Sequence, residues 1–263
     1  MAVIGFIGTG NMGGALARAA AKSGLAEELL LANRSPEKAQ RLAEELGGRR
    51  VSNQEAVLRA DLLFLGVKPQ MLEGMLAGVR EALEQRKERQ LIVSMIAGKS
   101  LQTLGELLGE DRPVIRIMPN IPAAVGAGVT LFCCSGTVTA EEKDLFRRLM
   151  AASGLVEEID EHLMEAASGV TGCGPAFAAM FVEALADGAV ACGLPRKQAL
   201  TFSAQMLLGT AQMLLESGEH PGILKDRVCS PAGSTIQGVR TLEERAFRAA
   251  VTDAVIATYE KKF

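Results

Sequence analysis

The feature that most constrains this chain is a glycine motif, GTGNMG, at residues 8–13. It follows a short apolar run at residues 3–7, which predicts a buried strand, and it opens a stretch with helical spacing at residues 11–23. In this context the first glycine makes a tight turn, the second lets the backbone approach a pyrophosphate, and the third lets helix and strand pack closely. The alternative is a glycine turn needed only for packing. We predict a dinucleotide cofactor bound by Gly8, Thr9, Gly10, Asn11, Met12 and Gly13.

Apolar strands alternate with helical patterns through the first 160 residues. One helix starts at Ser35-Pro36, where a capping residue precedes a proline at the first helical position, and it continues to Leu46. Apolar strands separated by helices indicate a parallel sheet covered on both faces, and right-handed crossovers then give a doubly wound α/β domain. We therefore predict a Rossmann-type NAD(P)-binding domain at residues 1–160. Its predicted strands are residues 3–7, 29–32, 60–67, 91–96, 114–118 and 128–134.

The chain changes character after about residue 160, where strand-like runs disappear. Residues 176–193, 195–217 and 242–262 are long, mostly apolar stretches that predict helices. A helix that is apolar nearly all round has to be buried, and a chain of this size cannot bury several of them within one subunit. We predict an all-α substrate-binding and dimerisation domain at residues 161–263. The alternative is a compact helical domain packed on the sheet.

The end of the second predicted strand bears on the choice of cofactor. An acidic residue there favours NAD, whereas an arginine can accommodate the 2′-phosphate of NADP. The chain has Asn33, Arg34 and Ser35 at this point and no acid. We predict NADPH as the cofactor, with NADH possible. The alternative is that Arg34 is a solvated turn residue.

Three later loops also follow predicted strands, so they should face the nicotinamide half of the cofactor. In the first of them Lys68 could be a catalytic acid, a cofactor contact or only a surface charge. The loops contain Val67, Lys68 and Pro69, then Ala97 and Gly98, and then Met118, Pro119 and Asn120.

Composition excludes several classes of protein. The chain has a formal net charge of -3 and only 4% aromatic residues, so we expect no nucleic-acid partner. Five cysteines without a CxxC pair, and only two histidines, argue against a disulfide framework and a metal site. Cys173 and Cys229 have no histidine near them in sequence, so we predict packing residues rather than nucleophiles, and the other cysteines as core. No stretch reaches about 18 uninterrupted apolar residues, and no signal peptide is evident, so we expect a cytoplasmic protein without a membrane partner.

Two segments in the C-terminal half combine small residues with hydroxyls. Residues 171–175, TGCGP, allow a close backbone approach by a ligand or by another helix. Residues 226–235, DRVCSPAGST, place hydroxyls and free backbone N–H groups near the start of a helix predicted at Gly233, which suits a carboxylate. The alternative is ordinary helix capping by Ser230 or Ser234.

With these segments the sequence resembles the pyrroline-5-carboxylate reductase family along essentially its whole length. The segment at 220–238 resembles the family's most specific signature. It departs from the usual pattern only in small-for-small changes, with Ala232 where a glycine is usual and Ser234 where many members have threonine. The matching segments are GFIGTGNMGGAL at 5–16, VKP at 67–69, IAG at 96–98, MPN at 118–120, TGCGPAF at 171–177, ADGAVACGLPR at 186–196 and HPGILKDRVCSPAGSTIQG at 220–238.

The resemblance implies reduction of 1-pyrroline-5-carboxylate to L-proline, the last step of proline biosynthesis, by hydride transfer from NAD(P)H to the C=N carbon. It implies that Ser230 and the backbone around Gly233 and Ser234 bind the substrate carboxylate. It also implies that Thr235 is the catalytic residue, as a hydrogen-bond partner or proton relay for the ring nitrogen. The predicted substrate site further includes Asn120, and the predicted cofactor site includes Asn53.

The resemblance also implies an assembly in which two subunits interlock through their helical halves, so we expect a homodimer or a larger ring of dimers such as a decamer. Three alternatives remain: a reductase of a related cyclic imine, a hydroxyacid dehydrogenase, and a dinucleotide-binding redox sensor without catalysis. Hydroxyacid dehydrogenases typically have a catalytic lysine on the first long helix of the second domain, and residues 175–193 contain no lysine.

Overall fold

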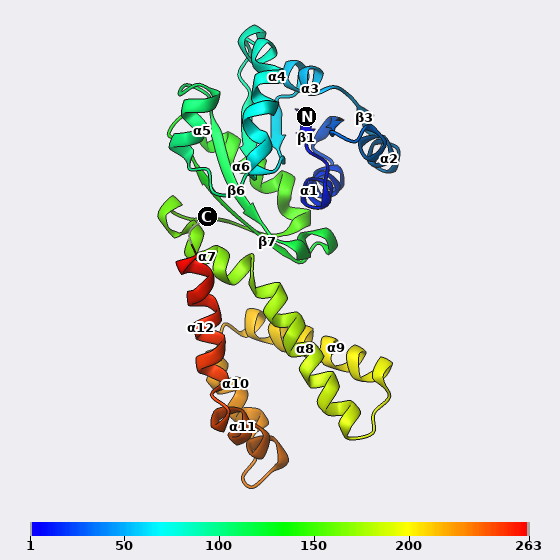
Figure 1. The fold of residues 1–263 in the computed structure, drawn as a ribbon, viewed down its shortest axis with the longest axis vertical. Coiled ribbons are helices and arrows are strands. Elements are labelled where there is room, and N and C mark those ends of the chain that lie inside the picture. The colour runs from blue at the N-terminus through cyan, green and yellow to red at the C-terminus, as the bar shows by residue number, and fades with distance from the viewer. Residues whose placement is uncertain (1, 262–263) are drawn as a thin grey trace. The chain divides into compact units, whose positions relative to one another are not determined.

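The computed structural model describes residues 2–261, which divide into two compact units. The first unit ends at Gly172 and the second begins at Cys173, and the ribbon in Figure 1 can be followed through both. This division lies later than the predicted boundary at residue 160, because α7 (Met164–Thr171) contacts strands of the first unit.

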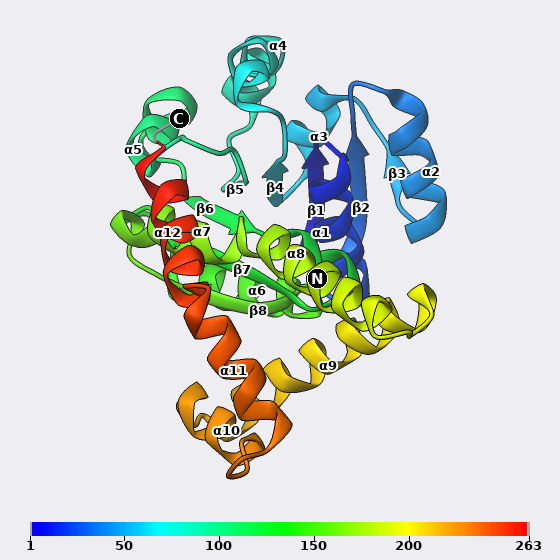
Figure 2. The same cartoon turned by 60° about the horizontal axis from the view of Figure 1, so that its bottom comes forward.

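Within the described residues the first unit has one eight-stranded sheet, with the order β3-β2-β1-β4-β5-β6-β7-β8. The chain runs from β1 outward to β3, then returns to the other side of β1 and continues with β4, so the order reverses beside β1 (Figure 2). That reversal is where open α/β sheets bind ligands. The strands are β1 (Ala2–Ile7), β2 (Ala26–Ala32), β3 (Arg49–Arg50), β4 (Leu62–Leu65), β5 (Leu91–Ser94), β6 (Val114–Pro119), β7 (Gly128–Cys134) and β8 (Gly154–Glu158).

The sheet departs from the predicted parallel arrangement at one place, since β6 and β7 pair antiparallel. Only the short helical turn η2 (Ile121–Val125) joins them, and a parallel crossover would need a dozen or more residues. The sequence analysis also missed two edge strands. β3 is a two-residue strand, and β8 has no fully buried residue, so neither has the apolar run by which the other strands were found.

Helices cover both faces of this sheet. Among them α2 begins at Pro36 directly after Ser35 and ends at Leu46, as predicted. The helices of the first unit are α1 (Asn11–Lys22), α2 (Pro36–Leu46), α3 (Asn53–Arg59), α4 (Leu72–Gln85), α5 (Leu101–Leu108), α6 (Ala140–Met150) and α7, with short turns η1 (Pro69–Met71), η3 (Ala151–Ser153) and η4 (Glu161–Leu163).

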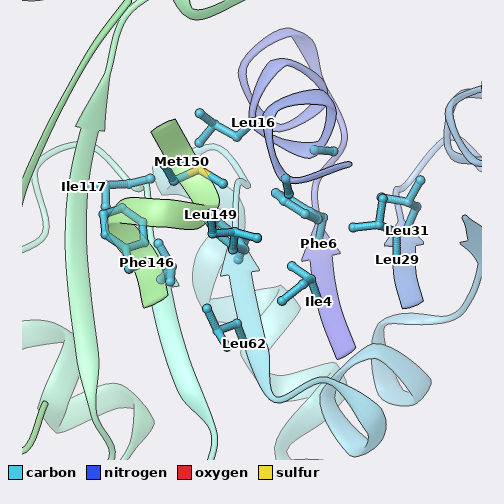
Figure 3. Packing of buried hydrophobic residues seen from close by; sticks show 14 of the residues in the cluster. Ile4, Phe6, Leu16, Leu29, Leu31, Leu62, Ile117, Phe146, Leu149 and Met150 are labelled. Atoms are coloured by element: carbon cyan, nitrogen blue, oxygen red, sulfur yellow. The ribbon is translucent and has the colours of Figure 1, made fainter. Parts of the chain in front are cut away.

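Successive residues of the central strands face opposite layers of the core. On β4, Leu62 belongs to the cluster formed with α1, α2 and α6, whereas Leu63 belongs to the cluster formed with α3, α4 and α5. Figure 3 shows residues of the first cluster, among them Phe6 of β1, Leu16 of α1 and Leu62. Both faces of the strands are therefore buried, which explains their uninterrupted apolar sequences.

In the part of the second unit that the structure describes, all regular elements are helices. α8 and α9 contact each other side by side (Figure 1). The stretch predicted as one helix at residues 242–262 is instead divided between α11 and α12, because Ala246 has a left-handed φ of 56°; its residue 262 lies outside the described residues. The helices are α8 (Gly174–Ala191), α9 (Arg196–Ser217), α10 (Pro221–Val228), α11 (Ser234–Glu244) and α12 (Phe247–Glu260).

Much of the apolar surface of α8 and α9 is exposed in the single chain. Met180 is 68% exposed, Leu208 58% and Leu215 84%. A groove of about 580 Å³ between the two helices is lined by mostly apolar residues, among them Met180 and Leu207. These helices were predicted to need a partner, and their apolar side chains are indeed exposed in the described part of this subunit.

Candidate functional site

The glycine motif lies on the loop between β1 and α1, where the strand order reverses. Gly8 has a φ of 101°, and a Cβ atom there would lie 2.5 Å from the carbonyl oxygen of Gly66 in the loop after β4. A Cβ atom on Gly13 would lie 2.0 Å from the carbonyl oxygen of Gly8. The fold itself thus requires these two glycines, one for the tight turn and one for the contact between helix and strand.

Gly10 is different, because a Cβ atom there would meet no atom within 4 Å. It is the N-cap of α1 and has no side chain to accept from the first amides of the helix. The hydroxyl of neighbouring Thr9 is buried and, among residues 2–261, has no hydrogen-bond partner. Open space, free helix amides and an unpaired buried hydroxyl fit the diphosphate of a dinucleotide.

A cleft of about 620 Å³ opens beside the glycine loop, between the end of β2 and the loop after β4. Most of the predicted cofactor residues meet there although they come from four separate loops. Those that line the cleft are Gly8, Gly10, Asn33, Arg34, Ser35, Asn53, Val67 and Lys68.

The other predicted cofactor residues do not line this cleft. Ala97 and Gly98 follow β5 and are exposed. Thr9, Asn11, Met12, Gly13 and Pro69 are sequence neighbours of the lining residues.

Sequence analysis missed several residues of the cleft, chiefly Lys38 and Met71. Lys38 lies in the first turn of α2, three residues after Ser35. Because residues three apart share a helix face, this spacing could have indicated that Lys38 faces the cleft together with Ser35. Met71 comes from the turn η1 after β4, and its Sδ lies 3.9 Å from Nη1 of Arg34. That contact joins residues 37 apart in the chain, so no local pattern indicates it.

The side chain of Asn120 joins two other parts of the first unit. It is 7% exposed, its Oδ1 accepts a hydrogen bond of 2.8 Å from the N–H of Val129, and its Nδ2 donates one of 2.9 Å to the carbonyl oxygen of Thr171. Both polar groups of the amide are used within the first unit. The structure therefore gives Asn120 a positioning role at the end of α7, and its predicted contact with substrate stays a prediction.

Arg116 on β6 fixes the other end of the same helix. Its Nη1 lies 3.1 Å from Oε1 of Glu161, and its Nη2 lies 2.7 Å from Oε1 of Glu165. Glu161 also accepts a hydrogen bond of 2.7 Å from the N–H of Leu101. The Arg116 side chain is only 6% exposed, so these two carboxylates neutralise a buried charge and hold α7 against the sheet.

Residues 230–235 span the end of the link between α10 and α11 and the first two residues of α11. Gly233 is the N-cap of α11, and the helix begins with Ser234 and Thr235. A Cβ atom on Gly233 would lie 2.3 Å from Oγ of Ser230, so a larger residue there would have to displace the serine hydroxyl. Among residues 2–261 no side-chain hydrogen bond caps α11, so the alternative of simple capping by Ser230 or Ser234 is not observed. The side chains of Ser230, Ser234 and Thr235 are exposed.

One histidine and two cysteines have surroundings that give them structural roles. His220 caps α10, because its Nδ1 accepts a hydrogen bond of 3.1 Å from the N–H of Gly222. Burial raises the pKa of Cys133 to about 12 and that of Cys134 to about 11, so both thiols stay protonated at neutral pH. Cys133 is a core residue as predicted, whereas Cys192 is exposed and that prediction is wrong.

Two protein-family models match the chain. Residues 161–262 match the model described as pyrroline-5-carboxylate reductase dimerisation. Residues 3–98 match the model described as NADP oxidoreductase, coenzyme F420-dependent. The first match covers the helical unit and α7, and the second covers the glycine loop and the cleft.

Curated relatives are similar over nearly the whole chain. The pyrroline-5-carboxylate reductase of Escherichia coli is 43% identical over 261 residues, which are 98% of this chain and 96% of the relative. The enzyme of that name from Methanosarcina acetivorans is 41% identical, with the same shares covered. The one from Pisum sativum is 38% identical over 98% of this chain and 94% of the relative.

Solved structures give the same picture. A pyrroline-5-carboxylate reductase from Coxiella burnetii has a TM-score of 0.91 at 30% identity and covers 99% of this chain and 97% of its own. A Plasmodium falciparum pyrroline carboxylate reductase with NADP bound has a TM-score of 0.86 at 30% identity, with the same coverage.

Proposed function

This chain belongs to the pyrroline-5-carboxylate reductase family and reduces 1-pyrroline-5-carboxylate to L-proline, and we propose that it does so with NADPH rather than NADH. A nicotinamide dinucleotide supplies the hydride for the imine carbon when it is bound. The observation that carries the NADPH proposal is the charge of the cleft. Arg34, Lys38 and Lys68 line it, and no carboxylate is among its lining residues, which favours the cofactor with the additional phosphate.

The proposed substrate contacts are the hydroxyls and amides of residues 230–235. Ser230 and the N–H groups at the start of α11 bind the substrate carboxylate, and Thr235 donates a hydrogen bond to the ring nitrogen. Their exposure and the absence of a side-chain cap on α11 support these roles. A protonated imine is already an electrophile, so the chain has only to orient the C=N bond and assist one proton.

The chain forms oligomers through its dimerisation region, and we propose a homodimer or a ring of such dimers. The exposed apolar residues of α8 and α9 support pairing through these helices. The helical run Glu161–Ala191 is long and apolar enough to cross a membrane by length and composition alone. Because it falls within the dimerisation match, we assign its apolar surface to a partner subunit and the enzyme to the cytoplasm.

A substrate panel tests the proposed activity against its alternatives. We expect NADPH oxidation with 1-pyrroline-5-carboxylate to exceed that with a six-membered cyclic imine acid and with a short β-keto acid. A higher kcat/KM for either competitor would reassign the enzyme within its class. Binding of NADPH without turnover of any of the three would indicate a redox sensor.

A further inference from the structure

Two basic side chains at the end of β2 face the same cleft from neighbouring positions. Arg34 is the second residue after the strand, and Lys38 lies one helical turn further on, in the first turn of α2. Both line the cleft together with Ser35. The backbone N–H of Lys38 donates a hydrogen bond of 3.1 Å to the carbonyl oxygen of Ser35, which fixes the start of the helix relative to the loop.

These two cations are not used by the fold. Three other arginines near this strand are paired, since Arg18 lies 2.6 Å from Glu45, and Arg49 and Arg59 lie 3.1 Å and 3.0 Å from Glu55. Within residues 2–261, by contrast, neither Arg34 nor Lys38 has a carboxylate within 4.0 Å. The only polar contact of the Arg34 guanidinium in this part of the chain is the sulfur of Met71, a weak acceptor.

The charge of the 2′-phosphate of NADPH would explain why two unpaired cations lie beside this cleft. A 2′-phosphate monoester carries about -1.5 to -2 charges near neutral pH, so a single guanidinium leaves part of it without a counter-charge. The ribose hydroxyl that replaces it in NADH needs no cation. From these observations, and on the premise that the enzyme prefers NADPH, we propose that Lys38 is a specificity-determining residue that binds the 2′-phosphate together with Arg34.

Arg41 provides a matched control on the same helix. It is exposed, as Lys38 is, and it does not line the cleft. Lys38→Gln and Arg41→Gln each remove one positive charge from α2, so general electrostatic attraction changes equally in both. Only a local contact with the cofactor distinguishes them.

The test is a fluorescence titration of NADPH and NADH with the wild type, Lys38→Gln and Arg41→Gln, without substrate. Adenosine 2′,5′-bisphosphate and adenosine 5′-monophosphate serve as competitors that differ only in the 2′-phosphate. We expect Lys38→Gln to weaken NADPH and the bisphosphate about tenfold, as for one charge-assisted hydrogen bond. NADH and the monophosphate should change less than about twofold, and Arg41→Gln should resemble the wild type.

Each contrary result has one meaning. A wild type that binds NADPH and NADH equally overturns the NADPH proposal and the role of Lys38 with it. A wild type that prefers NADPH, combined with an unchanged preference in Lys38→Gln, overturns the role of Lys38 alone. Equal weakening of both cofactors in Lys38→Gln would also overturn it, because the lysine would then act outside the 2′-phosphate.

Discussion

The two units of the chain differ in how much of their apolar surface they bury. In the first unit both faces of the sheet are covered, and large side chains such as Phe6, Phe64 and Phe146 are fully buried. Along α8 to α12, among the described residues, only Ala186, Ala199 and Ser203 are buried. Burying a large apolar side chain contributes about 1.5–3 kcal/mol to stability, and an exposed one does not make this contribution. The first unit therefore buries its own apolar surface, whereas the second leaves apolar surface exposed for the partner subunit that we propose.

A charge in the α8–α9 groove should have the largest effect, because it should prevent subunit association through the second unit and leave the first unit intact. Met180→Lys places a lysine in the exposed apolar surface that we assign to the partner. An unpaired buried charge costs about 3–5 kcal/mol, so association and turnover should be lost while the first unit still binds NADPH. Light scattering and nucleotide titration measure the two effects. Leu107→Lys, at a 39% exposed position on α5, is the control, and an unchanged oligomer in Met180→Lys would contradict the dimer surface.

Gly10→Val should separate cofactor binding from folding within the first unit. The side chain enters open space, so thermal unfolding should stay close to that of the wild type. If two charge-assisted bonds from the loop to the diphosphate are lost, nucleotide affinity should fall about 10³-fold. Gly13→Val should instead destabilise the unit, because its Cβ would collide with the Gly8 carbonyl oxygen. Unchanged nucleotide affinity in a folded Gly10→Val protein would place the cofactor elsewhere.

Thr235→Val should reveal a catalytic function of the second unit. It keeps the shape of the side chain and removes the hydroxyl, so kcat should fall about 10²-fold, with partial recovery at lower pH where more imine arrives protonated. NADPH affinity should not change. Thr241→Val is the matched control, since its hydroxyl only bonds to the Gln237 carbonyl of the same helix. Wild-type kcat at every pH would remove Thr235 from the mechanism.

The smallest expected effect concerns the rigidity of the substrate loop. Ala232 and Ala246 are the non-glycine residues with positive φ among those described, at 58° and 56°. Replacing either with glycine relieves left-handed strain in the folded state but raises the entropy of the unfolded chain. The free energy of unfolding should therefore change by no more than about 1 kcal/mol. We expect a raised KM only for Ala232→Gly, because that residue lies within residues 230–235, which we propose bind the substrate. Equal KM values for the two variants would show that Ala232 does not preorganise the loop.

The sequence predicted the parts of the molecule that depend on local pattern. The packing roles of Gly8 and Gly13 follow from the strand–loop–helix context, and the start of α2 follows from Ser35-Pro36; the structure confirms both. The role of Gly10 in binding the cofactor stays a prediction. The break at Ala246 could not be predicted, since neither glycine nor proline marks it.

Long-range contacts account for the other differences. The amide of Asn120 is engaged by a carbonyl 51 residues away, and the charge of Arg116 by carboxylates 45 and 49 residues away. No local pattern contains such partners. The sequence therefore shows which polar residues follow the strands. Which of these residues already have partners within the protein can be known only from the folded structure.

Isotope transfer tests the central claim most directly. The enzyme is incubated with 1-pyrroline-5-carboxylate and NADPH that carries deuterium at C4 of the nicotinamide, in separate reactions for the two C4 positions, and the L-proline formed is analysed by mass spectrometry. We predict that one of the two labelled cofactors, and not the other, delivers a single deuterium to the proline carbon derived from the imine. Proline without deuterium from either cofactor, or no NADPH-dependent proline at all, would contradict direct hydride transfer by this enzyme.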